Sequence, residues 1–279
     1  MEPKHAEQPR TAPVRKRWHR IALQILATCG GIGLLSLLGF VSHRQSEAPV
    51  HALEIQVQDA SGRSFLDSAA IAQLVLRAAP ELIGSPRAAV DLDSIHSLVS
   101  THPSIREVQA YITVDGRCVV KAAQRIPIAR IINRDGSSFY MDQDGFTMPL
   151  SRHATADVPV FTGNLSERMS DLPIPVMQKD STWSRRSHLD EILIFTRFLE
   201  NNEFMDAQVE HVVFNERGEM EAVPRVGNHR ILIGDATHLE KKYRKLLAFY
   251  AHTLHTRDLN QYRRINLKYD NQVVCEKNQ

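Results

Sequence analysis

The sequence predicts an α+β protein with one N-terminal transmembrane helix, a small βααββ domain and a C-terminal β-rich domain with packed helices. Three observations predict this class. First, a stretch of 21 residues carries no charge. Second, the residue pattern of the next part of the chain predicts the order strand, helix, helix, strand, strand. Third, the rest of the pattern predicts mainly short strands. With 43% hydrophobic and 24% charged residues, the 279-residue chain has an ordinary globular composition and is long enough for two domains.

The uncharged stretch at 21–41, "IALQILATCGGIGLLSLLGFV", has the length of a membrane span, because about 20 apolar residues cross a bilayer as a helix. The preceding tail at 1–20 carries six basic and two acidic side chains. The positive-inside rule therefore places this tail in the cytoplasm, next to membrane lipid, and the rest outside. A cleaved signal peptide is the alternative, but the apolar run is long and "GFVSH" is a poor cleavage site.

Charge and cysteine content exclude several classes of partner and site. The whole chain carries +2 and the tail +4, so the exported part carries −2, which gives no electrostatic footprint for nucleic acid. Cys29 lies in the predicted span, and no cysteine spacing fits a zinc site. Cys118 and Cys275 lie in strand-like runs, where either a disulfide or two unpaired thiols can be expected.

A linker at 42–48 leads into the predicted small domain at 49–124. "LEIQVQ" alternates apolar and polar residues, as a half-buried strand does. Asp67 is a candidate N-cap for the first helix, and "VDLDSIHSLVST", with Asp91 as a capping candidate, supplies the second. Two strand-like runs then flank Asp115-Gly116, which is a strong hairpin signal.

The predicted β-rich domain covers 125–275 and leaves a tail at 276–279. Its expected strands are "IARIIN", "SSFYMD", "VPVFTG", "EHVVFN", "GEMEAV", "RILIGD", "RRINLKYD" and "QVVCEK". Two helices should pack against them: one capped by Ser187, and a long one that starts near Thr237.

No catalytic or metal centre emerges from the residue patterns. Asp142-Gln143-Asp144-Gly145 looks like the start of a calcium loop, but the twelfth position is His153 rather than a bidentate glutamate. Asp135, Asp142 and Asp144 fit turns between strands instead. His252 and His255 lack a third ligand, and no nucleophile elbow or phosphate loop is present in the sequence. We expect no enzymatic activity, no cofactor, no metal and no small-molecule substrate.

Several motifs carry a family resemblance. "THPSIREVQAYITVDGRCVVKAAQRIPIARI" resembles the end of a POTRA domain followed by an Arg-x-Pro-x-Ala junction. "FYMDQDG", "VPVFTG", "ILIGDATHLEKKYRKLLAFY" and "INLKYDNQVV" resemble, in order, the later motifs of the bacterial FtsQ/DivIB cell-division family. Each motif alone is weak, but their order behind a predicted anchor is specific. Gln272 and Asn266 depart from the glycine and the acidic residue that are common in the family.

The resemblance implies a scaffold of the divisome in the cytoplasmic membrane at the division septum, with the C-terminal domain outside. It implies binding of small division proteins of the FtsB/FtsL type, and of other divisome membrane proteins, in control of septal wall synthesis. If Tyr269 to Cys275 lies at a sheet edge, its unpaired N–H and C=O groups favour binding by strand addition. The residues carried over are Tyr269, Asp270, Asn271, Val273 and Val274 on the closing strands, with Tyr243, Leu247 and Tyr250 on the neighbouring helix.

Two other functions stay open at the level of sequence. A POTRA-type polypeptide-binding factor in envelope translocation or assembly is the main alternative, and "LEIQVQ" or "RCVVKA" would then offer a second sheet edge. A periplasmic hydrolase would need catalytic side chains that converge only in the folded chain.

Overall fold

The computed structural model describes residues 26, 28–33, 47–58, 65–152, 154–169, 187–256 and 259–278. The tail predicted at 1–20, most of the predicted span at 21–41 and most of the linker lie outside these residues. Among the residues that are described, no helix combines the length and apolar character that a bilayer crossing requires.

Two compact units make up the described chain. One holds the described residues up to Ala52 together with Glu81–Val90 and Ile112–Cys118. The other holds the described residues of Leu53–Pro80, Asp91–Tyr111 and Val119–Gln279, and it contains the candidate site.

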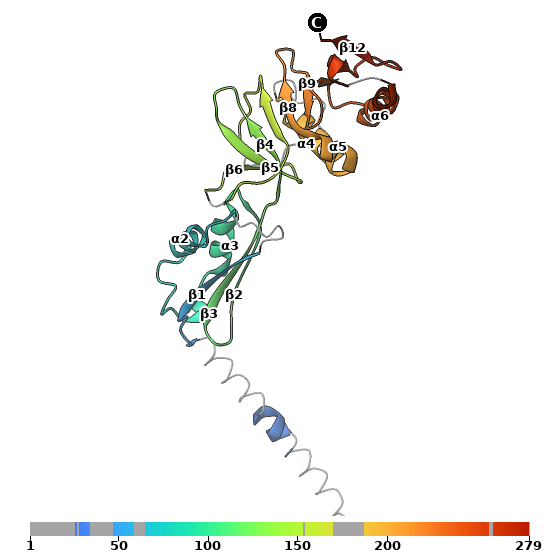
Figure 1. Cartoon of the computed structure of the whole chain (residues 1–279). Helices are drawn as coiled ribbons and strands as arrows, with labels where there is room; N and C mark the ends of the chain where they lie inside the picture. The colour runs from blue at the N-terminus through green and yellow to red at the C-terminus, as the bar shows by residue number, and fades with distance from the viewer. Residues whose placement is uncertain are drawn as a thin grey trace, which may run out of the picture. The chain divides into compact units, whose positions relative to one another are not determined.

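The first part of the chain forms a three-stranded sheet with two helices, in the predicted order strand, helix, helix, strand, strand (Figure 1). The elements are β1 (Ala52–Gln58), α2 (Ser68–Ala78), a 3₁₀ turn (Arg87–Ala89), α3 (Leu92–Ser100), β2 (Ile105–Ile112) and β3 (Arg117–Gln124). The strand order is β1-β3-β2. The prediction that "RCVVKA" is a sheet edge is therefore wrong, because β3 is the central strand, whereas "LEIQVQ" in β1 does lie at an edge.

Local signals in this region form as predicted. The Asp67 side chain accepts a hydrogen bond from the Ala69 N–H at 2.9 Å and caps α2. Asp91 accepts one from the Ser94 N–H at 3.0 Å and caps α3. The turn between β2 and β3 contains Gly116 at φ 91°, a conformation that favours glycine.

The remaining strands form one nine-stranded sheet with the order β12-β11-β10-β9-β8-β7-β4-β5-β6. The strands are β4 (Pro127–Ile132), β5 (Ser138–Asp142), β6 (Thr147–Pro149), β7 (Val160–Gly163), β8 (Val209–Phe214), β9 (Met220–Pro224), β10 (Arg230–Gly234), β11 (Tyr262–Asn266) and β12 (Val274–Lys277). Its helices are α4 (Leu189–Glu200), α5 (Glu203–Gln208), α6 (Leu239–Thr256) and a 3₁₀ turn (Leu259–Gln261).

All eight predicted strands of the β-rich part are present, and the structure adds β6 and α5. The predicted cap of α4 is shifted by one residue. His188 occupies the N-cap position without a side-chain cap bond. The Ser187 hydroxyl accepts a hydrogen bond from the Leu189 N–H at 3.2 Å and donates one to Glu167 at 2.6 Å. Ser187 thus still satisfies a first-turn N–H of α4.

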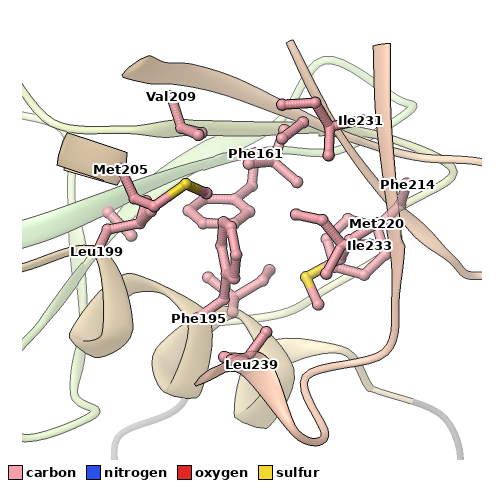
Figure 2. Packing of buried hydrophobic residues seen from close by; sticks show 14 of the residues in the cluster. Phe161, Phe195, Leu199, Met205, Val209, Phe214, Met220, Ile231, Ile233 and Leu239 are labelled. Carbon is pink, nitrogen blue, oxygen red and sulfur yellow. The ribbon is translucent and has the colours of Figure 1, made fainter. Parts of the chain in front are cut away.

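The core lies between the sheet and helices α4, α5 and α6. Figure 2 shows its central side chains, among them Phe161, Phe195 and Phe214, which are at most 1% exposed. The rings of Phe161 and Phe195 meet edge to face, with centroids 6.4 Å apart. Phe161 comes from β7 in the middle of the sheet, so it links the sheet to α4.

Gly163 explains the glycine of the "VPVFTG" motif. It pairs with Phe214 across the parallel strands β7 and β8 and has a φ of +97°. A Cβ atom at this position would lie 2.2 Å from the Phe214 carbonyl oxygen. Only glycine fits both the backbone conformation and the close approach.

The stretch "RIPIARIINRDGSSFYMDQDG" has a structural role that depends on a buried ion pair. Asp142 is 1% exposed, and its carboxylate lies 2.7 Å from Arg125 Nη1. The other carboxylate oxygen accepts hydrogen bonds from the N–H groups of Asp144 and Phe146, at 3.0 and 2.8 Å. The Arg125 guanidinium also lies 3.7 Å from the centroid of the Phe146 ring. Asp142 therefore stabilises the turn that contains Asp144 and Phe146, and it pairs with the buried Arg125.

The two cysteines of uncertain pairing are both free thiols. Cys118 is buried in β3, and Cys275 is half-buried in β12. Burial raises the pKa of each thiol, which makes both poor nucleophiles at neutral pH.

Candidate functional site

The C-terminal strand β12 is the end strand of the nine-stranded sheet. It pairs antiparallel with β11, and within the described residues no other strand pairs with it. The last described residue, Asn278, lies beside the residue that precedes β11, because its N–H donates a hydrogen bond to the Gln261 carbonyl oxygen at 2.9 Å. The outer side of β12 is thus a sheet edge.

The Asn278 hydrogen bond also fixes which backbone groups face outward. Successive N–H groups along a strand point to opposite sides in the plane of the sheet. The N–H groups of Glu276 and Val274 therefore point toward β11, as that of Asn278 does. The N–H groups of Cys275 and Lys277 point to the open side, where the carbonyl oxygens of an added strand could accept hydrogen bonds from them.

Three predicted residues, Tyr269, Asp270 and Asn271, form the turn before β12 and are exposed. Asn271 takes the positive φ of 57° in this turn. The Lys245 ammonium group donates to the carbonyl oxygens of Leu267 and Tyr269, each at 2.6 Å, and ties the turn to α6. Burial lowers the pKa of Lys245, and the nearby Asp270 carboxylate partly offsets this effect.

The two predicted valines divide between the faces of the sheet. Val274 is 41% exposed, whereas Val273 is half-buried and packs against the core together with Cys275. Alternation along the strand thus leaves Val274 and Glu276 on the outer face and directs Val273 and Cys275 toward the helices.

The three predicted residues of α6 differ in their accessibility. Tyr243 and Leu247 are half-buried. Tyr243 lies beside the rings of Phe198 and Phe204, at centroid distances of 5.9 and 6.5 Å. Tyr250 is 6% exposed and belongs to the core. The closing turn and the outer face of β12 are therefore exposed, whereas Tyr250 is buried in the core.

Tyr250 forms a buried pair with His229. The Tyr250 hydroxyl lies 2.8 Å from His229 Nε2. The His229 ring is 1% exposed, and its Nδ1 has no hydrogen-bond partner among the described residues. Burial lowers the pKa of His229 and raises the pKa of the Tyr250 phenol.

This pair predicts an acid-dependent loss of stability. Below the ordinary histidine pKa of 6.5, the unfolded chain gains a proton at His229 that the folded chain resists. The free energy of unfolding should therefore fall as pH drops below about 6.5, by at most about 1.4 kcal/mol per pH unit from this residue. Denaturant titrations between pH 5 and 8 should show a shallower pH dependence in His229→Gln. The same substitution at exposed His96 is the matched control, and identical slopes for both variants would refute the assignment.

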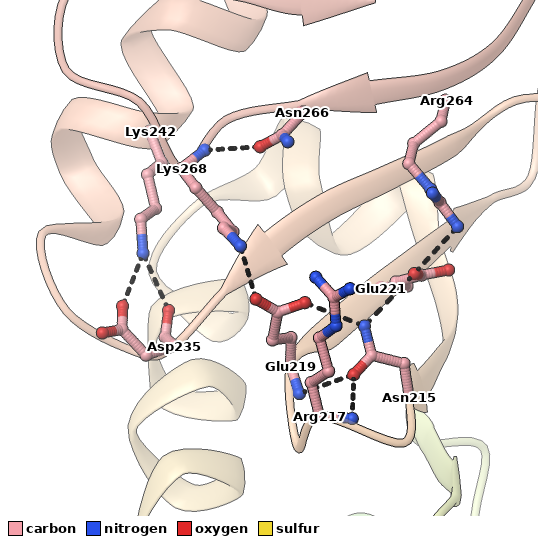
Figure 3. Close-up of polar contacts among 9 residues, drawn as sticks. All are labelled: Asn215, Arg217, Glu219, Glu221, Asp235, Lys242, Arg264, Asn266 and Lys268. Carbon is pink, nitrogen blue, oxygen red and sulfur yellow. Dashed lines mark hydrogen bonds and ion pairs between the residues drawn. The ribbon is translucent and has the colours of Figure 1, made fainter. Parts of the chain in front are cut away.

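Beside the start of α6 lies a groove of about 490 Å³. Its charged lining comprises Arg217, Lys241, Lys242, Lys245 and Lys268 together with Glu219, Asp235 and Asp270. The ammonium nitrogen of Lys242 lies 2.7 Å from an Asp235 carboxylate oxygen. Figure 3 shows this pair and the pair of Lys268 with Glu219. Burial raises the pKa of Asp235, but hydrogen bonds from Lys242 and Thr237 outweigh this effect and lower it to about 2. The groove has an excess of basic groups and reaches the predicted residue Asp270.

A row of charges on the outer sheet face was not predicted. Glu221 of β9 is 6% exposed and lies 3.3 Å from Arg264 of β11, whose other terminal nitrogen lies 3.3 Å from Glu276 of β12. Figure 3 shows the contact between Glu221 and Arg264. The alternation of Arg264 with Ile265 in "YRRIN" marks the exposed face, but no sequence pattern pairs residues 43 positions apart.

Within the described residues, no three His, Cys, Asp or Glu side chains gather as metal ligands could. His252 is exposed on α6, and the side chain of its candidate partner at position 255 lies outside the described set. Around β12, Glu276 pairs with Arg264, and the arrangement offers outward backbone N–H groups and surface charge to a partner.

Two stretches of the chain match known family models. Residues 50–122 match the POTRA-like domain model, and residues 126–276 match the model described as FtsQ/DivIB, C-terminal related. A comparison with curated proteins found no match. Both descriptions are of non-catalytic scaffold families, and the second is of cell-division proteins. Because its model covers more than half of the 279 residues, the chain belongs to the FtsQ/DivIB C-terminal related family.

Proposed function

We propose that the protein is a single-pass, membrane-anchored scaffold of the bacterial division complex. It binds small division proteins of the FtsB/FtsL type by strand addition to β12 and so helps control septal wall synthesis. The basic tail stays in the cytoplasm, and the two domains, at 49–124 and 125–275, lie outside the membrane at the septum. Membership of a cell-division family supports the complex, and the open edge of β12 is the observation that carries the binding mode.

Strand addition suits this edge for physical reasons. An incoming strand gains main-chain hydrogen bonds from the outward N–H groups of Cys275 and Lys277, and side chains on both faces then supply selectivity. Tyr269 and Val274 are 48% and 41% exposed beside these groups and give the partner apolar surface to cover. Leu247 and Tyr243 on α6 are half-buried, so they can add contact area without unfolding the core.

A proline at position 275 tests this binding mode. Cys275→Pro removes an outward N–H without breaking a hydrogen bond to β11, and edge strands tolerate proline in that orientation. The loss of one main-chain bond and the steric clash of the ring should weaken partner binding about tenfold or more. The measurement is affinity of the full chain for the FtsB/FtsL-type proteins of the same organism. Cys275→Ala, which keeps the N–H, is the matched control.

Melting curves of both variants separate binding from folding. Lys277→Pro removes the other outward N–H and should act in the same direction, whereas Glu276→Pro should destabilise the fold because its N–H points toward β11. Undiminished partner binding by a folded Cys275→Pro chain would overturn strand addition at β12.

A second candidate function rests on the three-stranded sheet, whose β1 and β2 are both end strands. These edges fit a POTRA-type polypeptide-binding factor in envelope translocation or assembly. The exposed polar residues Arg106, Glu107 and Gln109 along β2 weigh against it, because charged edges discourage strand pairing. Binding of an unfolded model polypeptide that persists in Cys275→Pro would favour this function.

A further inference from the structure

The outer face of the sheet carries a row of charges that ends at the open edge. In register, Arg230 of β10 lies opposite Arg264 of β11, and Arg264 lies opposite Glu276 of β12. Glu221 of β9 lies beside both arginines. The row therefore crosses four adjacent strands and reaches the strand that we propose as the docking edge.

Glu221 shows how this row neutralises its charges. Two arginines directly opposite each other repel, which destabilises a sheet. One oxygen of Glu221 lies 3.3 Å from Arg264 and the other lies 3.8 Å from Arg230, so a single carboxylate holds a cation with each of its oxygens. The side chain of Glu221 is only 7% exposed, which strengthens both interactions relative to a surface pair.

Glu276 contacts one arginine, whereas Glu221 contacts two. Its Oε1 atom lies 3.3 Å from Arg264, on the side of β11. The opposite side faces the open edge, and the side chain is 54% exposed. Glu276 thus presents a carboxylate with a cation on one side and, on the other, the place where the next strand of the sheet would lie.

The backbone places Glu276 where a docked side chain would come closest. Its N–H points to β11, so opposite an antiparallel added strand it occupies a non-hydrogen-bonded position, where facing Cα atoms are about 4.5 Å apart. The Arg264 backbone would lie two strand spacings away, at about 9.6 Å, and its guanidinium reaches the Glu276 carboxylate only from the side of β11. The nearest charge, that of Glu276, therefore dominates what the added residue experiences.

We infer that the strand that docks on β12 carries a lysine or arginine opposite Glu276 and, two positions away on the same face, an apolar residue against Val274. This inference rests on the proposed strand addition and names the chemistry of the partner segment. A basic side chain there would complete for Glu276 the two-cation arrangement that Glu221 has. An acidic side chain at that position would face a carboxylate across the closest pair of the ladder.

A displayed library of random twelve-residue peptides, selected on the full chain, tests the inference. Peptides that also bind Cys275→Pro are discarded, so the remaining peptides depend on the edge. These should be enriched in lysine or arginine at one position and in an apolar residue two positions away. Selection on Glu276→Lys should exchange the basic preference for an acidic one.

Affinities of a selected peptide and of its Lys→Glu counterpart make the test quantitative. Glu276→Lys should weaken the basic peptide about two- to fivefold and strengthen the acidic one by a similar factor, in line with cross-strand ion pairs. Both effects should shrink at 0.5 M salt. Glu216→Lys, an equal charge change in the exposed turn between β8 and β9, is the control for net charge.

The possible outcomes distinguish a failure of the predicted basic residue from a failure of strand addition itself. Peptides that depend on the edge but show no basic preference, or a preference unchanged by Glu276→Lys, would overturn the inference and leave strand addition intact. A selection that yields no edge-dependent peptide, together with unchanged partner binding by Cys275→Pro, would overturn both. Melting curves of Glu276→Lys establish that the edge strand is still folded.

Discussion

Replacing Asp142 with alanine should destabilise the protein by about 3–5 kcal/mol, because it leaves the buried Arg125 charge without its partner. The side chains of Arg125 and Asp142 are 10% and 2% exposed, so water cannot replace the lost contact at low cost. The substitution also deprives the N–H groups of Asp144 and Phe146 of their acceptor. Urea unfolding followed by circular dichroism measures the change.

Three further variants locate the source of this effect. Asp142→Asn keeps an acceptor for the two N–H groups but loses the charge, so its cost should be intermediate. Arg125→Met combined with Asp142→Asn should cost less than the sum of the single changes, since no lone charge stays buried. Asp144→Ala, two residues away and 41% exposed at its side chain, should cost less than about 1 kcal/mol. Equal costs for Asp142→Ala and Asp144→Ala would contradict the buried pair.

Replacing Phe161 with alanine should cost about 3–5 kcal/mol, the usual loss for a large aromatic side chain deleted from a core. Phe161 is fully buried at the centre of the cluster in Figure 2 and meets the ring of Phe195 edge to face. The cavity cannot collapse easily, because Phe161 lies on β7, with strands paired on both of its sides.

Phe204→Ala is the natural control, since Phe204 is 39% exposed on α5. It should cost clearly less, and Phe161→Leu should fall between the two because it keeps part of the volume. Denaturant midpoints at constant slope measure all three. If Phe204→Ala proved as costly as Phe161→Ala, the prediction that the buried Phe161 ring contributes more to stability than the exposed Phe204 ring would be wrong.

Under the proposed strand addition these two contacts matter for function, because an edge strand can select partners only if the sheet behind it is rigid. Strand β12 lies five strands from β7, and its outward N–H groups keep their direction through the ladder that connects them. Variants at Asp142 or Phe161 should therefore lose partner binding only in proportion to unfolding. In contrast, Cys275→Pro should lose binding while folded.

The sequence alone determined most elements of the fold. Asp67 and Asp91 cap the helices they were predicted to cap, and the hairpin at Asp115-Gly116 forms. Such signals act over two to four residues, where one hydrogen bond or one alternation of side chains decides the backbone. Ordered motifs likewise predicted the family that the comparisons then showed.

Tertiary structure decided which groups meet and which surfaces stay open. Sequence gave no reason for Arg125 to pair with Asp142, for Glu221 to hold two arginines, or for "RCVVKA" to be a central strand. Tyr250 shares the apolar stripe of α6 with Tyr243 and Leu247, yet only Tyr250 is buried, against His229. Strand order and helix docking are set by contacts between residues far apart in the sequence. Many alternative arrangements close loops at a similar entropic cost, so a local sequence pattern cannot select one arrangement over another.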